Sequence, residues 1–285
     1  MRPSQAAVFG LSAVFSVAAL AETPAERGAY LVNTIAACGN CHTPKNPDGS
    51  EQRDKTLAGG FVIELPPFTA VAPNITQDAE TGIGRWTDQQ IARAIREGVR
   101  PDGTVIGPPM PVEFYSKISD RDAAAIVAHL RTVAPVRNAA AKSVYRIRLP
   151  DNWGNAAGDP DPPPQSDRVA YGAYLAGPVG HCMECHTPMR ADGTGRDLAR
   201  AGAGGVPVAG PSGLVVPPNI TPDREAGIGR WTDGEIKRAI TQGVSRDGRK
   251  LSPPMPFAYY ARMTIRDLDA VVAHLRSLKP LPAQP

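Results

Sequence analysis

Two short stretches of the chain combine cysteine and histidine at the same spacing. The sequence reads ACGNCHTP at 37–44 and HCMECHTP at 181–188, which places the repeated side chains at Cys38, Cys41 and His42, and at Cys182, Cys185 and His186. Such a motif can bind zinc, form a disulfide, act as a redox dithiol or attach a haem covalently. All 4 cysteines of the 285 residues lie in these motifs, so their chemistry is performed twice.

Spacing and context separate these four chemistries. A zinc site would place its cysteine pairs roughly 15–20 residues apart, whereas here they are 144 apart. A redox dithiol accompanies a βαβ pattern, which this sequence lacks, and a disulfide leaves both histidines without a role. Covalent haem attachment uses every residue, since the thiols join the vinyl groups and the histidine binds iron. We therefore predict two covalently attached haem c groups, with thioethers at Cys38, Cys41, Cys182 and Cys185 and proximal ligands His42 and His186.

The second axial ligand of each iron is a methionine, a histidine or absent. Met110 and Met255 align with each other inside Pro-Pro-Met-Pro, 68 and 69 residues beyond the proximal histidines. Flanking prolines restrict the loop and lower the entropy lost when a sulfur is held on iron. We predict that Met110 and Met255 are these ligands, although a loop methionine can also simply fill a gap in the core. His129 and His274, inside the last helix of each copy, are expected to pack against the first helix.

The whole chain repeats itself. PNITQDAETGIGRWTD at 73–88 matches PNITPDREAGIGRWTD at 218–233, an offset of 145 that becomes 144 before this block. A repeat of this length indicates a duplicated domain. The Pro, Gly and Asp-rich stretch between the copies indicates a linker. We predict an export signal over 1–21, domains over 22–135 and 168–285, and a linker over 136–167.

Each copy shows the same pattern of helix signals. The first helix spans about 25–37 or 169–176, and the next begins at Thr87 or Thr232 in a capping box and ends at Gly98 or Gly243. The last begins at Ser119 or Thr264. No convincing strand alternation is present, so the predicted fold is all-α. Gly28 and Gly172 are expected to let the first and last helices approach closely.

Other aligned polar and aromatic residues allow two interpretations. Trp86 and Trp231, and likewise Asn74 and Asn219, either belong to the core or hold a haem propionate. His181 precedes Cys182 and has no counterpart in the first copy, so we expect it to make hydrogen bonds near the surface.

The N-terminus and the composition indicate the compartment. Arg2 precedes an apolar run of roughly 15 residues, shorter than the roughly 20 that span a bilayer, and small residues flank position 20. We predict cleavage before Glu22 and a periplasmic protein. A net charge of +3 does not call for a nucleic acid partner, and 30 prolines with 28 glycines indicate a loop-rich globular protein.

The combined motifs resemble a known family. Cys-x-x-Cys-His-Thr-Pro, Pro-Asn-Ile-Thr, Gly-Ile-Gly-Arg-Trp-Thr-Asp, Pro-Pro-Met-Pro and a closing Ala-His-Leu-Arg are similar to the class I cytochrome c domains of bacterial alcohol and gluconate dehydrogenase cytochrome subunits. The resemblance implies the same cysteine, histidine and methionine ligands, a dehydrogenase as electron donor, and a cytochrome or oxidase as acceptor. The best-known members have three haem domains and often a membrane-binding segment; here we expect two domains and no membrane span in the mature chain.

An iron bound by histidine and methionine is closed to substrate and suits one-electron transfer. We therefore expect a dihaem electron carrier and not an enzyme. The alternative, a dihaem redox enzyme such as a peroxidase, would need one open haem and would gain from unequal halves. Around the methionines, residues 99–113 carry Arg100 against Asp102 and Glu113, giving −1, whereas residues 244–258 carry three basic residues against Asp247, giving +2. Either this difference is ordinary solvated charge or the second domain docks an acidic partner.

Overall fold

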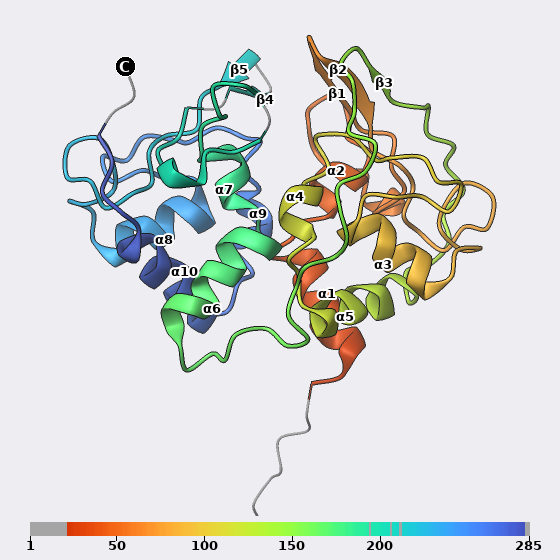
Figure 1. The fold of residues 1–285 in the computed structure, drawn as a ribbon, viewed down its shortest axis with the longest axis horizontal. Coiled ribbons are helices and arrows are strands. Elements are labelled where there is room, and N and C mark those ends of the chain that lie inside the picture. The colour runs from red at the N-terminus through yellow and green to blue at the C-terminus, as the bar shows by residue number, and fades with distance from the viewer. Residues whose placement is uncertain (1–21, 194, 206, 211–212, 283–285) are drawn as a thin grey trace, which may run out of the picture.

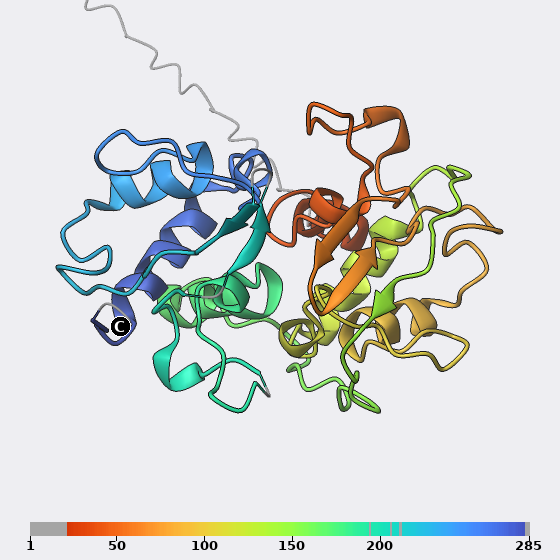
Figure 2. The same cartoon turned by 90° about the horizontal axis from the view of Figure 1, so that it is seen from above.

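The computed structural model describes residues 22–193, 195–205, 207–210 and 213–282. The predicted export signal over 1–21 lies outside the described residues. The chain forms two lobes that lie side by side (Figures 1 and 2), which we call the first half (22–135) and the second half (168–282). No helix in the described ranges is long and apolar enough to cross a membrane.

Helices make up most of the regular structure of each half. The first half contains α1 (Pro24–Asn33), α2 (Gly39–His42), η1 (Arg53–Lys55), β1 (Val62–Leu65), β2 (Phe68–Val71), α3 (Asp88–Arg96), α4 (Val112–Tyr115) and α5 (Asp120–Leu130). The second half contains α6 (Arg168–Tyr174), η2 (Leu175–Val179), α7 (Cys182–Cys185), η3 (Leu198–Arg200), β4 (Val208–Gly210), β5 (Gly213–Val215), α8 (Asp233–Gln242), α9 (Phe257–Tyr260) and α10 (Ile265–Ser277).

The helix boundaries follow the predicted caps. Thr87 and Thr232 each accept a hydrogen bond from the backbone N–H three residues later and complete a capping box. Gly98 and Gly243 both adopt φ +63°, the left-handed conformation that glycine takes after a helix. Local sequence therefore determines where α3 and α8 begin and end.

The prediction of an all-α fold is wrong in one respect, because short antiparallel strands are present. β1, β2 and β3 (Val144–Tyr145) form one small sheet, in which Val62 pairs with Val71 and Phe68 with Tyr145. β4 and β5 form a hairpin with Val208 opposite Val215. These strands have at most 4 residues, too few for alternation to be recognised inside loops rich in proline and glycine.

Two glycines let the first and last helices of each half cross closely. A Cβ on Gly28 would lie 1.8 Å from the carbonyl oxygen of Ala125 in α5. A Cβ on Gly172 would lie 1.9 Å from the carbonyl oxygen of Ala270 in α10. The predicted role of both glycines is confirmed. His129 and His274 lie against these same glycines, so they pack on the first helix as predicted.

The two halves share one continuous hydrophobic core, to which α1 and α5 contribute from one side and α6 and α10 from the other. Two equivalent hydrogen bonds cross the interface. The Tyr30 hydroxyl donates to Asp267 Oδ2 at 2.7 Å, and the Tyr174 hydroxyl donates to Asp122 Oδ2 at 2.8 Å. Because these residues occupy matching positions in the repeat, the halves are related by an approximate two-fold axis.

Most of the segment predicted as a linker lies against the first half. Residues 143–160, which include β3 and which we call the strap, run down beside α4 before the chain crosses to α6 (Figure 1). The Ala157 N–H donates to the Ser116 carbonyl at 2.7 Å, and the Asp120 N–H donates to the Asp159 carbonyl at 3.0 Å. The strap therefore forms part of the surface of the first half.

Candidate haem-attachment sites

The first Cys-x-x-Cys-His motif forms a tight turn directly after α1. The Cys38 N–H donates to the Val32 carbonyl at 3.1 Å, and α2 follows at once. The ring of His42 is buried, and its Nδ1 lies 2.8 Å from the carbonyl oxygen of Pro73. This contact fixes the ring with Nδ1 as the donor, which leaves Nε2 as the nitrogen able to bind a metal.

The second motif repeats this arrangement. His186 Nδ1 lies 2.8 Å from the Pro218 carbonyl oxygen, the equivalent of Pro73 in the repeat. The backbone carbonyls of both histidines accept bonds of 2.7 Å, from Gly59 for His42 and from Gly204 for His186. Burial lowers the pKa of both histidines, so each imidazole is neutral, as a metal ligand must be.

The four cysteines are free thiols. Burial raises the pKa of Cys38 and Cys185 to about 12 and that of Cys41 and Cys182 to about 11, so all four are protonated at neutral pH. Within the described residues, His, Cys, Asp and Glu form no group of three or more that could bind a metal ion by themselves. Paired half-buried thiols beside an oriented histidine fit haem attachment better than zinc binding or a reactive dithiol.

The predicted methionine ligands occupy equivalent loops. Both Met110 and Met255 are partly buried, and each carbonyl accepts a bond of 2.9 Å from the residue two positions later, at the start of α4 or α9. Met110 packs against the shared core. By contrast, Met183 is a core residue that is only 5% exposed. Iron ligation by Met110 and Met255 stays a prediction that their matching placement supports.

Asn74 and Asn219 both bond to the chain that follows the last helix of their half. The Asn74 amide donates to the Val136 carbonyl at 2.8 Å and to Thr81 Oγ1 at 3.0 Å. The Asn219 amide donates to the Leu281 carbonyl at 2.7 Å. Asn74 is buried, as a core role requires, whereas Asn219 is half-buried. Trp86 and Trp231 are partly buried against the core, and a bond to a propionate stays a prediction for all four residues.

Contacts between the halves join the two sites, and these were not predicted. Asn40, inside the first motif, donates to the carbonyl of Pro254 beside Met255 at 3.3 Å. His181, beside the second motif, meets the Tyr115 ring edge-on at 5.7 Å, and its Nδ1 lies 3.1 Å from Glu184. The expected hydrogen bond of His181 is therefore present. Spacing within one repeat carries no signal for contacts between repeats, which explains the omission.

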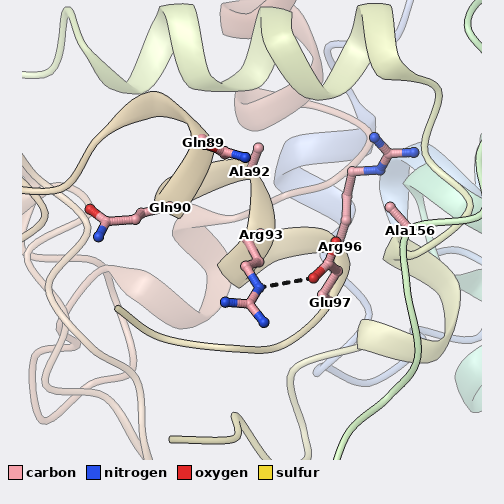
Figure 3. A pocket seen from close by; sticks show the side chains of 7 residues that line it. All are labelled: Gln89, Gln90, Ala92, Arg93, Arg96, Glu97 and Ala156. Atoms are coloured by element: carbon pink, nitrogen blue, oxygen red, sulfur yellow. Dashed lines mark hydrogen bonds and ion pairs between the residues drawn. The ribbon is translucent and has the colours of Figure 1, made fainter. Parts of the chain in front are cut away.

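A surface hollow of about 440 Å³ lies elsewhere, over α3 (Figure 3). Arg93 and Glu97 form an ion pair of 3.0 Å at its edge. Its lining consists of Gln89, Gln90, Ala92, Arg93, Arg96, Glu97 and Ala156. Neither motif contributes to it, so the hollow is separate from the candidate sites.

Comparison with known proteins agrees with this geometry. Residues 25–134 match the cytochrome c family. The chain is 33% identical over 223 residues to a dihaem c-type cytochrome of Cereibacter sphaeroides, covering 74% of this chain and 70% of that protein. It is 32% identical over 266 residues to the cytochrome subunit of a fructose dehydrogenase of Gluconobacter japonicus, covering 88% of this chain and 52% of that protein.

A third relative extends the same group. The cytochrome c subunit of a quinone alcohol dehydrogenase of Gluconobacter oxydans is 31% identical over 301 residues, covering 98% of this chain and 60% of that protein. The chain thus spans a little over half the length of these two dehydrogenase subunits. The two Cys-x-x-Cys-His turns define a protein that carries covalently bound haem. The chain belongs to the c-type cytochrome family.

Proposed function

We propose that this protein is an exported dihaem electron carrier, which accepts electrons from a dehydrogenase and delivers them to another cytochrome or an oxidase. One observation carries the proposal: the chain builds the same half-buried thiol pair twice, each beside a histidine whose Nδ1 is held by a carbonyl 2.8 Å away. This arrangement presents two thiols and one imidazole nitrogen to each of two haems.

The residues of each half have separate tasks. In the first half, Cys38 and Cys41 would anchor the haem covalently, His42 Nε2 and Met110 would bind its iron, and the carbonyl of Pro73 orients the histidine. In the second half, Cys182, Cys185, His186, Met255 and Pro218 would serve in the same way. A haem held in this way would supply reversible one-electron storage.

The lobe interface favours electron exchange between the two sites. Cys41 and Cys185 belong to different halves, yet they lie close enough for the Cys41 sulfur to contribute to raising the pKa of Cys185. Asn40 and His181 form direct contacts across the same interface. In this proposal the two class I cytochrome c domains therefore act as one unit with a short path between their haems.

The proposed partners follow from the relatives. Several are named as cytochrome subunits of fructose, alcohol and gluconate dehydrogenases, and we assign a dehydrogenase of this general kind as the electron donor. The apolar N-terminal segment supports export to the periplasm, where c-type haem is attached in bacteria.

An optical redox titration of the purified protein tests the function. We expect two haems per chain, both reversibly reduced and both showing the weak sulfur-to-iron band when oxidised. Met110→Leu and Met255→Leu should each remove this band from one haem and lower its reduction potential, because methionine raises the potential. A haem that lacks the band in the unmodified protein, or that changes spin state when its neighbour is reduced, would instead favour a peroxidase.

A further inference from the structure

The loop that carries Met110 is covered by the strap. A Cβ on Gly107 would lie 2.6 Å from the ring of Tyr145, so this ring rests directly on the glycine backbone. Trp153 Nε1 donates to the Ile106 carbonyl at 2.8 Å, and its ring lies 2.6 Å from a Cβ placed on Gly98. Two aromatic side chains of the strap thus close the outer face of the loop.

The equivalent loop of the second half has no room for such a cover. Ser252 stands where the first half has Gly107, so its side chain occupies the space in which a ring equivalent to Tyr145 would lie. Phe257 stands in place of Val112, and its ring lies 2.9 Å from a Cβ placed on Gly243. Phe257 therefore fills the position that Trp153 takes beside Gly98. Within the described residues, the turn before Pro253 therefore lacks an aromatic cover, whereas the Pro253 carbonyl would lie 3.3 Å from a Cβ on Gly210 in β4 and the Pro254 carbonyl accepts from Asn40.

The second loop is more exposed at its end than the first loop, and it is also more basic. Gly107 is buried and its counterpart Ser252 is exposed, whereas the turns before them, 101–104 and 246–250, are exposed in both halves. Arg246, Arg249 and Lys250 against Asp247 leave the 244–258 region at +2, with Arg246 lying 3.9 Å from Glu235 of α8. In the first loop the one basic side chain, Arg100, is bound to its own loop through the Val105 carbonyl at 3.2 Å.

We propose that residues 246–252, within the loop 244–256, form the docking surface for a redox protein with an acidic face, and that the strap covers the end of the equivalent loop of the first half at Gly107. The inference rests on the proposed function and adds which of the two haems exchanges electrons with the partner. Electrons are exchanged with this partner at the second haem, whereas the first haem communicates through the lobe interface. Opposite charge raises association rates by tenfold or more and makes them sensitive to salt.

Docking is tested on the reduced holoprotein with hexacyanochromate(III), a paramagnetic, redox-inert trianion. We expect it to broaden backbone amide NMR signals of 244–256 selectively and to leave those of 99–111 sharp. Arg249→Glu with Lys250→Glu should weaken this binding on the order of tenfold. Lys142→Glu with Arg148→Glu, which reverses two exposed charges on the strap and its approach, should leave the broadening at 244–256 unchanged.

A kinetic measurement extends the test to a macromolecule. Reduction by reduced flavodoxin, an acidic one-electron donor, should be salt-dependent and should slow about tenfold in the Arg249→Glu, Lys250→Glu variant but not in the strap variant. Gly107→Ser should displace Tyr145 and make the first loop newly accessible to a neutral nitroxide probe, which, unlike the hexacyanochromate trianion, is not repelled by the net charge of −1 on 99–113. Equal broadening of both loops in the unmodified protein, or equal slowing in both charge variants, would overturn the docking surface. Two reversibly reducible haems with no preferred loop would refute this inference alone and leave the proposed function standing.

Discussion

The two halves of this protein orient their motif histidines and cross their helices in the same way, but their surfaces differ. His42 and His186 are each held by a proline carbonyl at 2.8 Å, and Gly28 and Gly172 each bring two helices into contact. Around the methionines the halves diverge, since the end of one loop is covered by aromatic rings and the turn of the other is exposed and basic. The contrast fits the proposal, in which holding a haem admits little variation and the surrounding surface decides which haem meets a partner.

The haem sites offer the strongest test of that equivalence. Replacing Cys182 and Cys185 with serine should remove one haem per chain and leave the other attached, because each pair of thiols serves only its own half. The matched change at Cys38 and Cys41 should do the same for the first half. Haem content by pyridine haemochrome and the mass of the intact protein measure both. Loss of both haems from either variant would show that the two attachments depend on each other.

The crossings of the first and last helices should be equally important for stability in the two halves. Gly28→Ala would bring a Cβ to 1.8 Å from a backbone oxygen, and Gly172→Ala would bring one to 1.9 Å. Such overpacking costs about 1–3 kcal/mol or more, because the helices must move apart. Gly177→Ala serves as the control, since no atom outside the local chain lies within 4 Å of its Cβ position. Denaturant unfolding measures all three, and equal stability of the crossing variants and the control would contradict the packing argument.

The sequence predicts the features that repeat within one half. The caps at Thr87 and Thr232, the glycine crossings and the two motifs follow from residue type and spacing, because the interactions involved are local or occur twice. The hairpins were missed because strands of four residues give too short a pattern. The contacts of Asn40 and His181 across the interface were also missed, since they depend on how the lobes pack, which no single repeat encodes. The same holds for the strap, whose role depends on where Tyr145 and Trp153 come to rest.

The two tyrosine–aspartate hydrogen bonds across the interface should contribute unequally to stability. Asp122 is bound by Arg27 at 2.9 and 3.0 Å in addition to Tyr174. In the part of the chain that the structure describes, no lysine or arginine pairs with Asp267, which receives the Tyr30 hydroxyl. Tyr30→Phe should therefore cost more than Tyr174→Phe, with a loss of about 1–3 kcal/mol when a buried carboxylate loses its donor.

Unfolding free energies of the two single variants measure this difference. A double-mutant cycle of Tyr30→Phe with Asp267→Asn isolates the bond itself. An equal or larger loss in Tyr174→Phe would show that Arg27 does not compensate Asp122.

The smallest difference lies in the capping boxes. The Thr87 N–H donates to the neutral amide oxygen of Gln90 at 2.8 Å, whereas the Thr232 N–H donates to the carboxylate of Glu235 at 2.7 Å. The bond from the Thr232 backbone lowers the pKa of Glu235 from its usual value near 4.5. A carboxyl with a lowered pKa in the folded state stabilises the fold above its unfolded pKa and loses that contribution as the pH falls through the lower value. The N-terminus of α8 should therefore loosen below pH 4.5, while that of α3 should not.

The amide chemical shift and hydrogen exchange of Thr232 and Thr87, followed across this pH range, measure the two caps side by side. Glu235→Gln gives the second half the cap of the first, and it should remove the pH dependence at Thr232 while preserving the bond. The dependence would persist in Glu235→Gln if it arose from another group, and the capping explanation would then fail. Glu235 also lies 3.9 Å from Arg246, so the amide shift of Thr232, rather than helix stability, reports the change from amide to carboxylate at the cap itself.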